Sequence, residues 1–353
     1  MKAIVKYGFG KGETEIRDVA VPQIGENDVL LEVKAAGVCG TDIAFDNGGH
    51  EELLRPPVIL GHEFSGVVAR VGKNVKDWEP GDRVVSDNTG KVCGKCYACG
   101  QSNFLYCSER LGLGYGMDGG FTKYVKILGE TLKTFPQSLM RIPEGISFEE
   151  AAILDPCCNG YMAVVQESRI MPGDFGAVFG VGPLGLFAIQ AMRVSGASKI
   201  IAIGLSEDEE RFKLARKLGA TDVVVADKED VKQRVSEITG REEVVLTADC
   251  AGLNQVLLQA LDITRPAGQI VKIGYDSRPV NYSLDIAVNK GISIKGHFGY
   301  NWISWRNSMN LILAGSIDMK SMISHKMGIF DFREAFDLVR NKKAIKIILY
   351  PEE

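Results

Sequence analysis

The sequence contains no apolar run that approaches the roughly 18 residues needed to span a bilayer. Its first residues, MKAIVKYGFGKGETEIRD, also lack the apolar core and the small-residue cleavage site of a secretion signal. We therefore expect a cytoplasmic protein, not a membrane-spanning or secreted one.

An excess of positive charge is also missing. The formal net charge is -4, and basic and acidic residues are interspersed along the chain. Proteins that bind nucleic acid or anionic membranes usually present clustered lysine and arginine. We therefore expect neither nucleic acid nor a membrane as the partner.

What the chain does have is the composition of a globular enzyme. Of its 353 residues, 45% are hydrophobic and 24% are charged. These values are typical of a soluble enzyme with two domains, each large enough to bury its own core.

The first part of the chain, up to about residue 150, contains short runs of β-forming residues separated by Gly, Pro and Asp. Examples are KAIVKY, DVLLEVKAAGV, RVVSD and FTKYVKI. They predict a mostly β domain with many loops. Near its end, Ser147 and Glu150 have the spacing of a capping box before the helical run FEEAAIL, and a second helix is expected from Pro156.

From about residue 175, apolar strand-like runs alternate with helical stretches. GAVFG is followed by PLGLFAIQAMRVSG, and KIIAI is followed by EDEERFKLARKLG. Because parallel strands need helical crossovers, this alternation predicts an α/β fold with a doubly wound parallel sheet. The helical segments SWRNSMNLILAG and FREAFDLVRN and the strand KIILY are expected to return to the first domain.

The segment GVGPLG lies between the strand GAVFG and the following helix. Gly180, Gly182 and Gly185 would permit a tight turn and close packing, and the helix opened by Pro183 and Leu184 would supply N–H groups to a pyrophosphate. A plain turn is the alternative, but within the strand–helix series we predict a dinucleotide-binding site.

The carboxylate that would bind the adenosine ribose is not evident after the second strand, where Gly204 and Ser206 follow KIIAI. A glycine there leaves room for a 2′-phosphate, but the acids at 207–210 would repel it, and one of them could accept from a 2′-hydroxyl. We therefore predict NAD in preference to NADP, with Ser206, Asp208 and Arg211 as candidate contacts. The same acids would also stabilise a helix capped by Ser206, and Arg211 would favour NADP if it turned toward the ribose.

Four cysteines are concentrated in CGKCYACGQSNFLYC, where Cys93, Cys96, Cys99 and Cys107 occur without a histidine among them. Disulfides seldom persist in a reducing cytosol, so such a cluster favours metal binding or catalysis over cross-linking. A redox Cys-x-x-Cys pair is the alternative, but overlapping pairs with a fourth cysteine fit a metal better than a dithiol switch.

Other candidate metal-binding residues lie far apart in the sequence. GVCGTD places Cys39 after a strand, and GHEFSG contains His62 and Glu63. Cysteine, histidine and carboxylate all bind zinc, and a catalytic zinc takes about three protein ligands and leaves a position for water or substrate. Each residue alone has a structural alternative, as a buried thiol or a hydrogen-bonded histidine.

Together these motifs resemble the zinc-dependent medium-chain dehydrogenases, the alcohol and polyol dehydrogenase family. The resemblance is carried by CGTD, GHEFSGVVARVGKNV, the four-cysteine segment, DGGFTKYV and GVGPLG in this order, and it covers essentially the whole chain. It implies a GroES-like catalytic domain in residues 1–155 with a structural zinc lobe at about 90–110, a Rossmann domain in residues 156–293, and a return to the catalytic domain in residues 294–353. The active site would lie between the two domains.

The resemblance also implies the roles of the metal candidates. Cys39 and His62 would bind the catalytic zinc, Glu63 would be a ligand or a carboxylate that exchanges with water, and Asp155 in LDPCCNGYMAV would be the remaining ligand. The four cysteines at 93–107 would bind a structural zinc whose closed geometry leaves no position for a substrate.

Some details depart from the family or stay open. Cys157 and Cys158, on the same turn as the Asp-Pro pair, are alternative ligands. Thr41 matches the hydroxyl that relays the alcohol proton in relatives, but the histidine that many relatives place five residues after the cysteine is Ala44. The relay would then end through the nicotinamide ribose and water or through His50, which is otherwise expected to be a surface residue.

The implied reaction is oxidation of a secondary hydroxyl of a polyol, cyclitol or sugar, with zinc as a Lewis acid and hydride transfer to NAD(P). An L-threonine 3-dehydrogenase-like enzyme and a catalytically silent nucleotide-binding protein are the alternatives. A homotetramer or homodimer is expected from the family. Candidates for substrate contacts are Asp46, Phe64, Tyr115 and the segment HFGYNW at 297–302.

Overall fold

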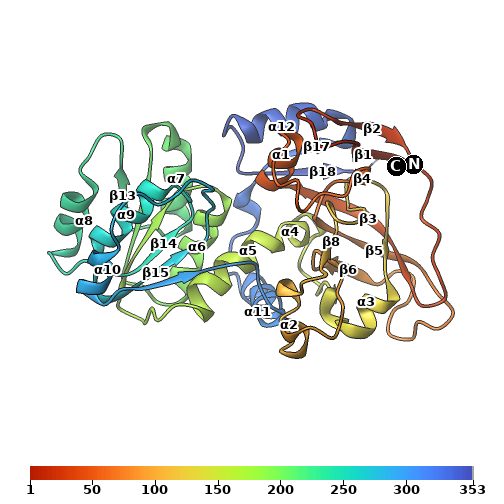
Figure 1. Cartoon of the computed structure of the whole chain (residues 1–353), viewed down its shortest axis with the longest axis horizontal. Helices are drawn as coiled ribbons and strands as arrows, with labels where there is room; N and C mark the ends of the chain where they lie inside the picture. Colours follow the sequence, from red (N-terminus) through yellow and green to blue (C-terminus); the bar gives the residue numbers. More distant parts are fainter. Residues whose placement is uncertain (352–353) are drawn as a thin grey trace. The chain divides into compact units, whose positions relative to one another are not determined.

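The computed structural model describes residues 1–351 and divides the chain into two compact units (Figure 1). The first unit contains Met1–Asp155 and the chain from Met322 onward, and the second is Pro156–Ser321. None of the helices within residues 1–351 is long and apolar enough to cross a bilayer.

The main sheet of the first unit is built around β3 (Val29–Val38). Eight of its ten residues are buried, as the apolar run VLLEVKAAGV predicts. It pairs antiparallel with three strands: β5 (Glu63–Val71), β9 (Tyr124–Ile127) and β18 (Lys346–Tyr350). The remaining strands of this sheet are β6 (Arg83–Ser86), β10 (Leu139–Arg141) and β17 (Ile323–Gly328).

Two smaller sheets complete the β structure of this unit. Their strands are β1 (Lys2–Lys6), β2 (Thr14–Asp18) and β4 (Val58–Ile59) in one sheet, and β7 (Thr89–Lys91) and β8 (Leu111–Gly112) in the other. The helices are short: α1 (Gly40–Asp46), α2 (Tyr97–Gly100), η1 (Phe104–Tyr106), α3 (Gly129–Thr134), η2 (Pro136–Ser138), α4 (Phe148–Ala152), η6 (Ile329–Asp331) and α12 (Phe332–Arg340). The first unit is therefore mostly β with many loops, as predicted.

The predicted capping box at the start of α4 is present. Ser147 Oγ accepts a hydrogen bond from Glu150 N at 3.2 Å, and Ser147 N donates to Glu150 Oε2 at 2.8 Å. This reciprocal pair satisfies two backbone N–H groups that a helix start leaves without partners.

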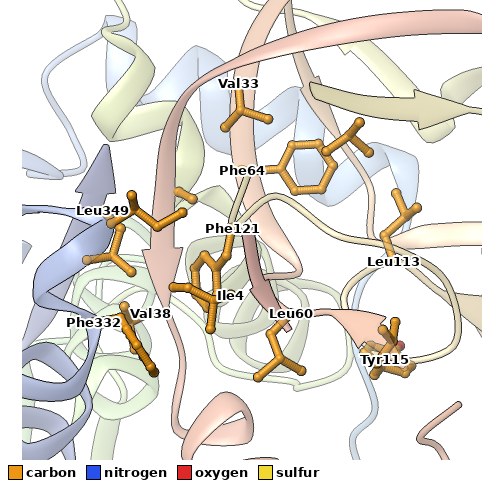
Figure 2. Close-up of a cluster of buried hydrophobic side chains, with 14 of the residues drawn as sticks. Ile4, Val33, Val38, Leu60, Phe64, Leu113, Tyr115, Phe121, Phe332 and Leu349 are labelled. Atoms are coloured by element: carbon orange, nitrogen blue, oxygen red, sulfur yellow. The ribbon is translucent and has the colours of Figure 1, made fainter. Parts of the chain in front are cut away.

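The core of the first unit joins segments from its two separated parts of the chain. Figure 2 shows Val33 of β3 and Phe64 of β5 in the same cluster as Phe332 of α12 and Leu349 of β18. Figure 1 shows β17, β18 and α12 in blue among the red and orange strands of this unit. The unit is therefore completed by chain that follows the whole second unit.

The second unit contains a six-stranded sheet in which every pairing is parallel. In spatial order its strands are β13 (Asp222–Val225), β12 (Lys199–Gly204), β11 (Phe175–Phe179), β14 (Val244–Asp249), β15 (Thr264–Lys272) and β16 (Ser293–Gly296). Counted along the chain, the order is third, second, first, fourth, fifth and sixth, which is that of the doubly wound dinucleotide-binding fold. The predicted fold class is confirmed.

Helices connect these strands. The connecting helices are α6 (Pro183–Val194), η4 (Ser206–Asp208), α7 (Glu209–Leu218), α8 (Val231–Thr239), α9 (Asn254–Ile263) and α10 (Asp285–Lys290). Helix α5 (Leu154–Tyr161) and the π-helix η3 (Met162–Gln166) precede the first strand, and α11 (Trp302–Leu313) and η5 (Lys320–Met322) follow the last. Helical crossovers of this kind are what parallel strands require.

The chain returns to the first unit at Met322, not at residue 294 as the sequence suggested. The reason is that β16 is hydrogen-bonded to β15, so ISIKG is the sixth strand of the parallel sheet. Helix α11, which contains SWRNSMNLIL, also belongs to the second unit.

Candidate active site

The pairing of β3 with β5 brings Cys39, His62 and Glu63 together. Gly37 lies opposite Glu63 in this antiparallel ladder, so the chain leaving β3 at Cys39 runs beside the chain entering β5 at His62. Ligand atoms of the three residues all lie within 4.8 Å of one another. Two motifs that are distant in the sequence therefore form one cluster of metal donors.

A buried carboxylate, Asp42, lies beside two of these donors. Its Oδ2 accepts a hydrogen bond from Cys39 N at 2.9 Å, and its Oδ1 lies 3.5 Å from His62 Nδ1. Burial alone would lower the pKa of His62, but the charges of Asp42 and Cys39 prevail and raise it well above the ordinary value. With Nδ1 facing the carboxylate, His62 offers Nε2 to a metal, an arrangement common among metal-binding histidines.

Sequence reasoning missed Asp42, although a signal was present. Asp42 follows Cys39 by three residues in GVCGTD, which is the spacing of a residue that turns back to the start of a helix. In the structure it does so at the first turn of α1.

A second missed residue, Lys346, contacts Glu63. Lys346 Nζ lies 2.5 Å from Glu63 Oε2 and donates to Val38 O at 2.9 Å. Burial alone would lower the pKa of Lys346, but the charge of Glu63 raises it above the ordinary value, so the pair is ionic. The other oxygen, Glu63 Oε1, is buried and has no hydrogen-bond partner within residues 1–351.

These observations fit a zinc ion. Thiolate, imidazole and carboxylate are the donors of catalytic zinc sites, which keep one position for water or substrate. An unpartnered buried carboxylate oxygen is unfavourable, and a cation held by Cys39, His62 and Glu63 would satisfy Glu63 Oε1. When bound, zinc acts as a Lewis acid toward a hydroxyl oxygen.

The four-cysteine lobe has the geometry of a closed metal site. Cys93 Sγ lies 3.6 Å from Cys107 Sγ and 3.9 Å from Cys99 Sγ, and no disulfide joins these residues. A tetrahedral zinc with Zn–S bonds of about 2.3 Å separates its sulfurs by about 3.8 Å. Backbone N–H groups of Cys93 and Cys96 also donate to sulfurs of the cluster, both at 3.3 Å, which favours thiolates.

The predicted nucleotide loop lies directly after β11 in the second unit. Gly180 has φ +86, and a Cβ there would lie 2.9 Å from Ala251 N. A Cβ at Gly185 would lie 1.8 Å from Gly180 O. Side chains are therefore excluded from both positions, as the close packing of a dinucleotide-binding turn requires.

Helix α6 begins at this loop. Gly182 is its N-cap, and Pro183 and Leu184 form its first turn. A proline at the first helical position removes an N–H that has no partner within the helix, while the remaining N–H groups and the helix dipole favour an anion. The loop and α6 therefore fit the pyrophosphate of a dinucleotide.

The segment after β12 differs from the expectation that Ser206 caps a helix. Ser206 N and Oγ both donate to Asp227, at 2.7 and 2.5 Å, and α7 starts only after the short turn η4. Asp208 Oδ2 accepts from Leu205 N at 3.0 Å, and its Oδ1 lies 3.3 Å from an Arg211 nitrogen. Ser206 is thus engaged by a carboxylate of the next strand–helix connection, which explains why it is not the cap.

Comparison with known proteins identifies the family. The alcohol dehydrogenase GroES-like domain matches residues 25–137, and the zinc-binding dehydrogenase domain matches residues 183–314. An uncharacterized zinc-type alcohol dehydrogenase-like protein of Escherichia coli K12 is 43% identical over 355 residues, covering 99% of this chain and 98% of that protein. The chain belongs to the zinc-dependent medium-chain dehydrogenases. The resemblance that the motifs indicated is confirmed.

Other members of the family also match over nearly their whole length. A sorbitol dehydrogenase of Halalkalibacterium halodurans is 33% identical and an L-threonine 3-dehydrogenase of Bacillus velezensis is 34% identical, each with 99% of both chains covered. Among solved structures, 2R,3R-butanediol dehydrogenase from Bacillus subtilis superposes with a TM-score of 0.89 at 29% identity, again over 99% of both chains. As a zinc-dependent medium-chain dehydrogenase, the protein is an oxidoreductase, and membership implies zinc, a nicotinamide cofactor and a small-molecule substrate.

Asp155, which the resemblance assigned to the zinc, lies in the first turn of α5. Its Oδ2 accepts a hydrogen bond from Asn88 Nδ2 at 3.1 Å. It is not in the group of mutually close donors that the described residues form around Cys39. The alternative ligands Cys157 and Cys158 are buried in the same helix, and neither belongs to the group of close donors around Cys39 within residues 1–351.

Of the residues of the expected proton relay, Thr41 lies near the start of α1. Thr41 Oγ1 is 3.7 Å from Cys39 Sγ. His50 is at the surface, as expected for the plain alternative: 45% of its side chain is exposed, and its Nδ1 lies 3.5 Å from a Glu52 oxygen. Ala44, on the same helix as Thr41, has no group that could continue a relay.

Two of the expected substrate contacts have structural roles instead. Phe64 is 1% exposed and belongs to the core cluster in Figure 2. The Asp46 carboxylate pairs with Arg333 at 3.3 Å and with Arg340 at 2.8 Å, which ties α1 to α12. Both expectations are corrected, because neither side chain is available to a substrate.

Tyr115 and the segment 297–302 were the other expected substrate contacts. The Tyr115 ring lies edge-on to the His62 ring, with centroids 6.2 Å apart, so it does lie beside the metal donors. In the second unit, His297 is buried, with Nδ1 2.6 Å from Glu167 Oε2 and Nε2 3.2 Å from Asn159 Oδ1. Its ring nitrogens are therefore engaged inside the unit.

Proposed function

We propose that the protein oxidises a secondary hydroxyl of a polyol, cyclitol or sugar and transfers the hydride to NAD. The observation that carries this proposal is the donor cluster of Cys39, His62 and Glu63 with its unpartnered Glu63 Oε1. The sorbitol dehydrogenase and the butanediol dehydrogenase among the relatives support the substrate class.

In this function the side chains around the donors position and balance them. Asp42 holds the His62 ring and the Cys39 backbone. Lys346 supplies a positive charge that offsets part of the negative charge of the donors. Thr41, whose hydroxyl is beside Cys39 Sγ, would accept the proton of the substrate hydroxyl while it gives its own proton to water.

We further assign Asp155 as the remaining zinc ligand. The support is its carboxylate in the first turn of α5, which is tied to Asn88 through Oδ2. A carboxylate held through one oxygen is oriented by that bond and can present the other to an ion. Zinc would then have three or four protein donors, depending on whether Glu63 stays bound.

NAD is proposed as the preferred cofactor over NADP. Arg211 would be the cation that attracts a 2′-phosphate, but it is paired with Asp208 at 3.3 Å. Asp227 adds a second carboxylate at Ser206. A phosphate with nearly two negative charges is repelled by such acids, whereas a 2′-hydroxyl can donate to one of them.

An L-threonine 3-dehydrogenase is the second candidate, favoured by the 34% identity with the enzyme of Bacillus velezensis. A catalytically silent nucleotide-binding protein is disfavoured, because a fold that only bound a nucleotide would not need the buried donor cluster of Cys39, His62 and Glu63. The substrate distinguishes the two enzymes, and the metal content distinguishes both from a silent protein.

We also propose a homodimer or homotetramer in the cytoplasm. The edge strand β16 has all four residues exposed, and an exposed edge can pair with the same strand of a second copy. A four-thiolate site also suits a compartment in which cysteines stay reduced. Light scattering of the purified protein measures the oligomeric state.

The test of the proposed function combines metal content with a substrate panel. Zinc per chain is measured by elemental analysis, and sugar alcohols, inositols, sugars and threonine are offered with NAD or NADP while the absorbance of the reduced cofactor is followed. Two zinc ions per chain and turnover of a polyol or sugar with NAD is the expected result. Turnover of threonine alone would favour the second candidate, and one zinc with no turnover of any secondary alcohol would overturn the proposal.

A further inference from the structure

The four-cysteine lobe is the connection between the two strands of a small sheet. It occupies residues 92–110, between β7 and β8, and Thr89 of β7 pairs with Gly112 of β8. Arg110 immediately precedes β8, and its backbone N donates to Cys107 O at 3.1 Å. The position of Arg110 is therefore set by the last cysteine of the lobe and by the β7–β8 pairing.

The Arg110 guanidinium bonds to three groups outside the lobe. Its Nη1 donates to the Tyr115 hydroxyl at 2.7 Å, its Nε donates to Thr89 Oγ1 at 3.2 Å, and its Nη2 donates to Asn88 Oδ1. A planar fork of donors can satisfy several acceptors at once in one orientation. Arg110 thus fixes Asn88, Thr89 and Tyr115 relative to one another.

The contact with Arg110 decides which way the Asn88 amide points. A guanidinium has only donors, so the amide oxygen Oδ1 must face it. The amide nitrogen Nδ2 is then turned the other way, where it donates to Asp155 Oδ2 at 3.1 Å. Without Arg110, the Asn88 amide would lose the contact that fixes the position of its Nδ2 donor beside Asp155.

We infer that Arg110 is a positioning residue through which the four-cysteine lobe holds Asp155 in place for the catalytic metal. The chain of contacts runs from Cys107 to Arg110, from Arg110 to Asn88, and from Asn88 to Asp155. The same guanidinium holds Tyr115, whose ring lies edge-on to His62. The inference rests on the proposed role of Asp155 as a zinc ligand.

The first test measures zinc affinity, which does not depend on turnover. Arg110→Met keeps an apolar stem but removes the guanidinium, and Asn88→Ala removes the bond to Asp155. Loss of such a supporting contact commonly weakens metal binding about 10–100-fold. Each variant is expected to keep the lobe zinc and to release the catalytic zinc to a chelating dye at a correspondingly lower dye concentration.

The double variant Arg110→Met/Asn88→Ala separates a chain of contacts from two independent effects. If Arg110 acts through Asn88, the double variant should bind zinc no more weakly than the weaker single variant. Arg110→Lys should recover only part of the affinity, because an ammonium cannot hold three acceptors in a planar fork. The matched control is Arg141→Met, which removes an exposed arginine that pairs with Asp82 in the same unit and should leave zinc affinity unchanged.

A further measurement addresses the lobe itself. Cys96→Ser, which removes one lobe donor, is expected to weaken the catalytic zinc in the wild-type background but to have no further effect in the Arg110→Met background. If Cys96→Ser does not fold, the Arg110 and Asn88 variants still decide the matter. Two results would overturn the inference. One is a double variant in which the losses of zinc affinity from Arg110→Met and Asn88→Ala add together. The other is a zinc affinity in these variants equal to that of Arg141→Met.

Failure of the inference is distinguishable from failure of the proposed function. If wild-type protein binds two zinc ions and turns over a secondary alcohol while Arg110→Met binds zinc as tightly, only the inference fails. If wild-type protein binds the lobe zinc alone, the proposed function fails and the inference fails with it.

Discussion

Lys346 and Glu63 form an ion pair that is almost completely shielded from solvent, with exposed side-chain fractions of 2% and 1%. The pairing of β18 with β3 creates it, because Ile347 lies opposite Val38 and therefore places Lys346 beside Cys39. One buried positive charge thus accompanies the donors Cys39, His62 and Glu63 before any metal is added.

Lys346→Met is expected to destabilise the metal-free protein by about 3–5 kcal/mol, because it leaves the charge of Glu63 buried without compensation. Zinc would supply the missing positive charge, so the loss should be smaller when zinc is present. Urea unfolding with and without saturating zinc measures both values.

The control for this prediction is the double variant Lys346→Met/Glu63→Gln. It removes both charges, so it should regain most of the stability of the metal-free protein. If Lys346→Met lowers the free energy of unfolding equally with and without zinc, Lys346 does not compensate charge at the metal site.

Asp42→Asn is expected to weaken zinc binding about 10–100-fold. The amide oxygen can still accept from Cys39 N, but the charge that faces His62 Nδ1 is lost. Competition with a chelating dye gives the affinity. Asp18→Asn is the matched control, since it removes an exposed carboxylate of the same unit, and equal affinities for the two variants would contradict the prediction.

Asp208→Asn is expected to raise the affinity for NADPH relative to NADH by about tenfold, or about 1.4 kcal/mol. The substitution removes the charge that pairs with Arg211 but keeps an oxygen for Leu205 N. Fluorescence titration with the two reduced cofactors measures the ratio. Glu209→Gln changes an exposed charge on the same segment and serves as the control, and an unchanged ratio in Asp208→Asn would exclude this role of Arg211.

Glu149 gives the first unit a pH-dependent contact. Its carboxylate lies 2.7 Å from Lys326 Nζ and accepts from the Tyr350 hydroxyl at 2.8 Å. Burial alone would raise its pKa, but these partners prevail and lower it from 4.5 to about 2. A depressed carboxyl pKa contributes stability that is complete above the unfolded value and is lost as the pH falls toward the folded value.

Glu149→Gln should therefore lower the melting temperature at pH 7, and the difference from wild type should shrink as the pH falls from about 4.5 toward 2. The effect is expected to be about 1 kcal/mol or less, because Lys326 is half exposed. Thermal unfolding of both proteins over this pH range tests it, with the exposed Glu144→Gln as control. A difference in melting temperature that stays constant or increases as the pH falls would show that the contact does not stabilise the protein in this way.

The sequence predicted the parts of the site that occur in contiguous motifs. Cys39, His62 and Glu63 were predicted as donors because they stand in short, recognisable segments, and the structure places them close together. Lys346 was not found, because its contact with Glu63 depends on strand pairing across 283 residues, and a lysine within KIILY gives no sign of which face of the strand it occupies. Asn88 and Arg110 were missed for the same reason, since their contacts arise from the β7–β8 pairing.

The sequence predicted the fold class correctly. The main error was the position at which the chain returns to the first unit. The alternating apolar and polar residues of ISIKG fit a strand in either unit. Only its hydrogen bonds to β15 assign it to the parallel sheet. Phe64 and Asp46 were misjudged because proximity in sequence to the donors does not reveal the direction of a side chain. Phe64 points into the core, and Asp46 points to the arginines of α12.

The interruption of the first unit by the second has a consequence for synthesis on the ribosome. Strands β3 and β5 emerge early, but β18 emerges only after the whole second unit, which can fold as soon as it has been made. Until then the nascent chain has Glu63 without its lysine, and the end of β3 at Ala36–Val38, which pairs with β18, is uncovered. We therefore expect the parallel sheet to be complete first, and the metal donors to gain their compensating charge only once β18 has emerged.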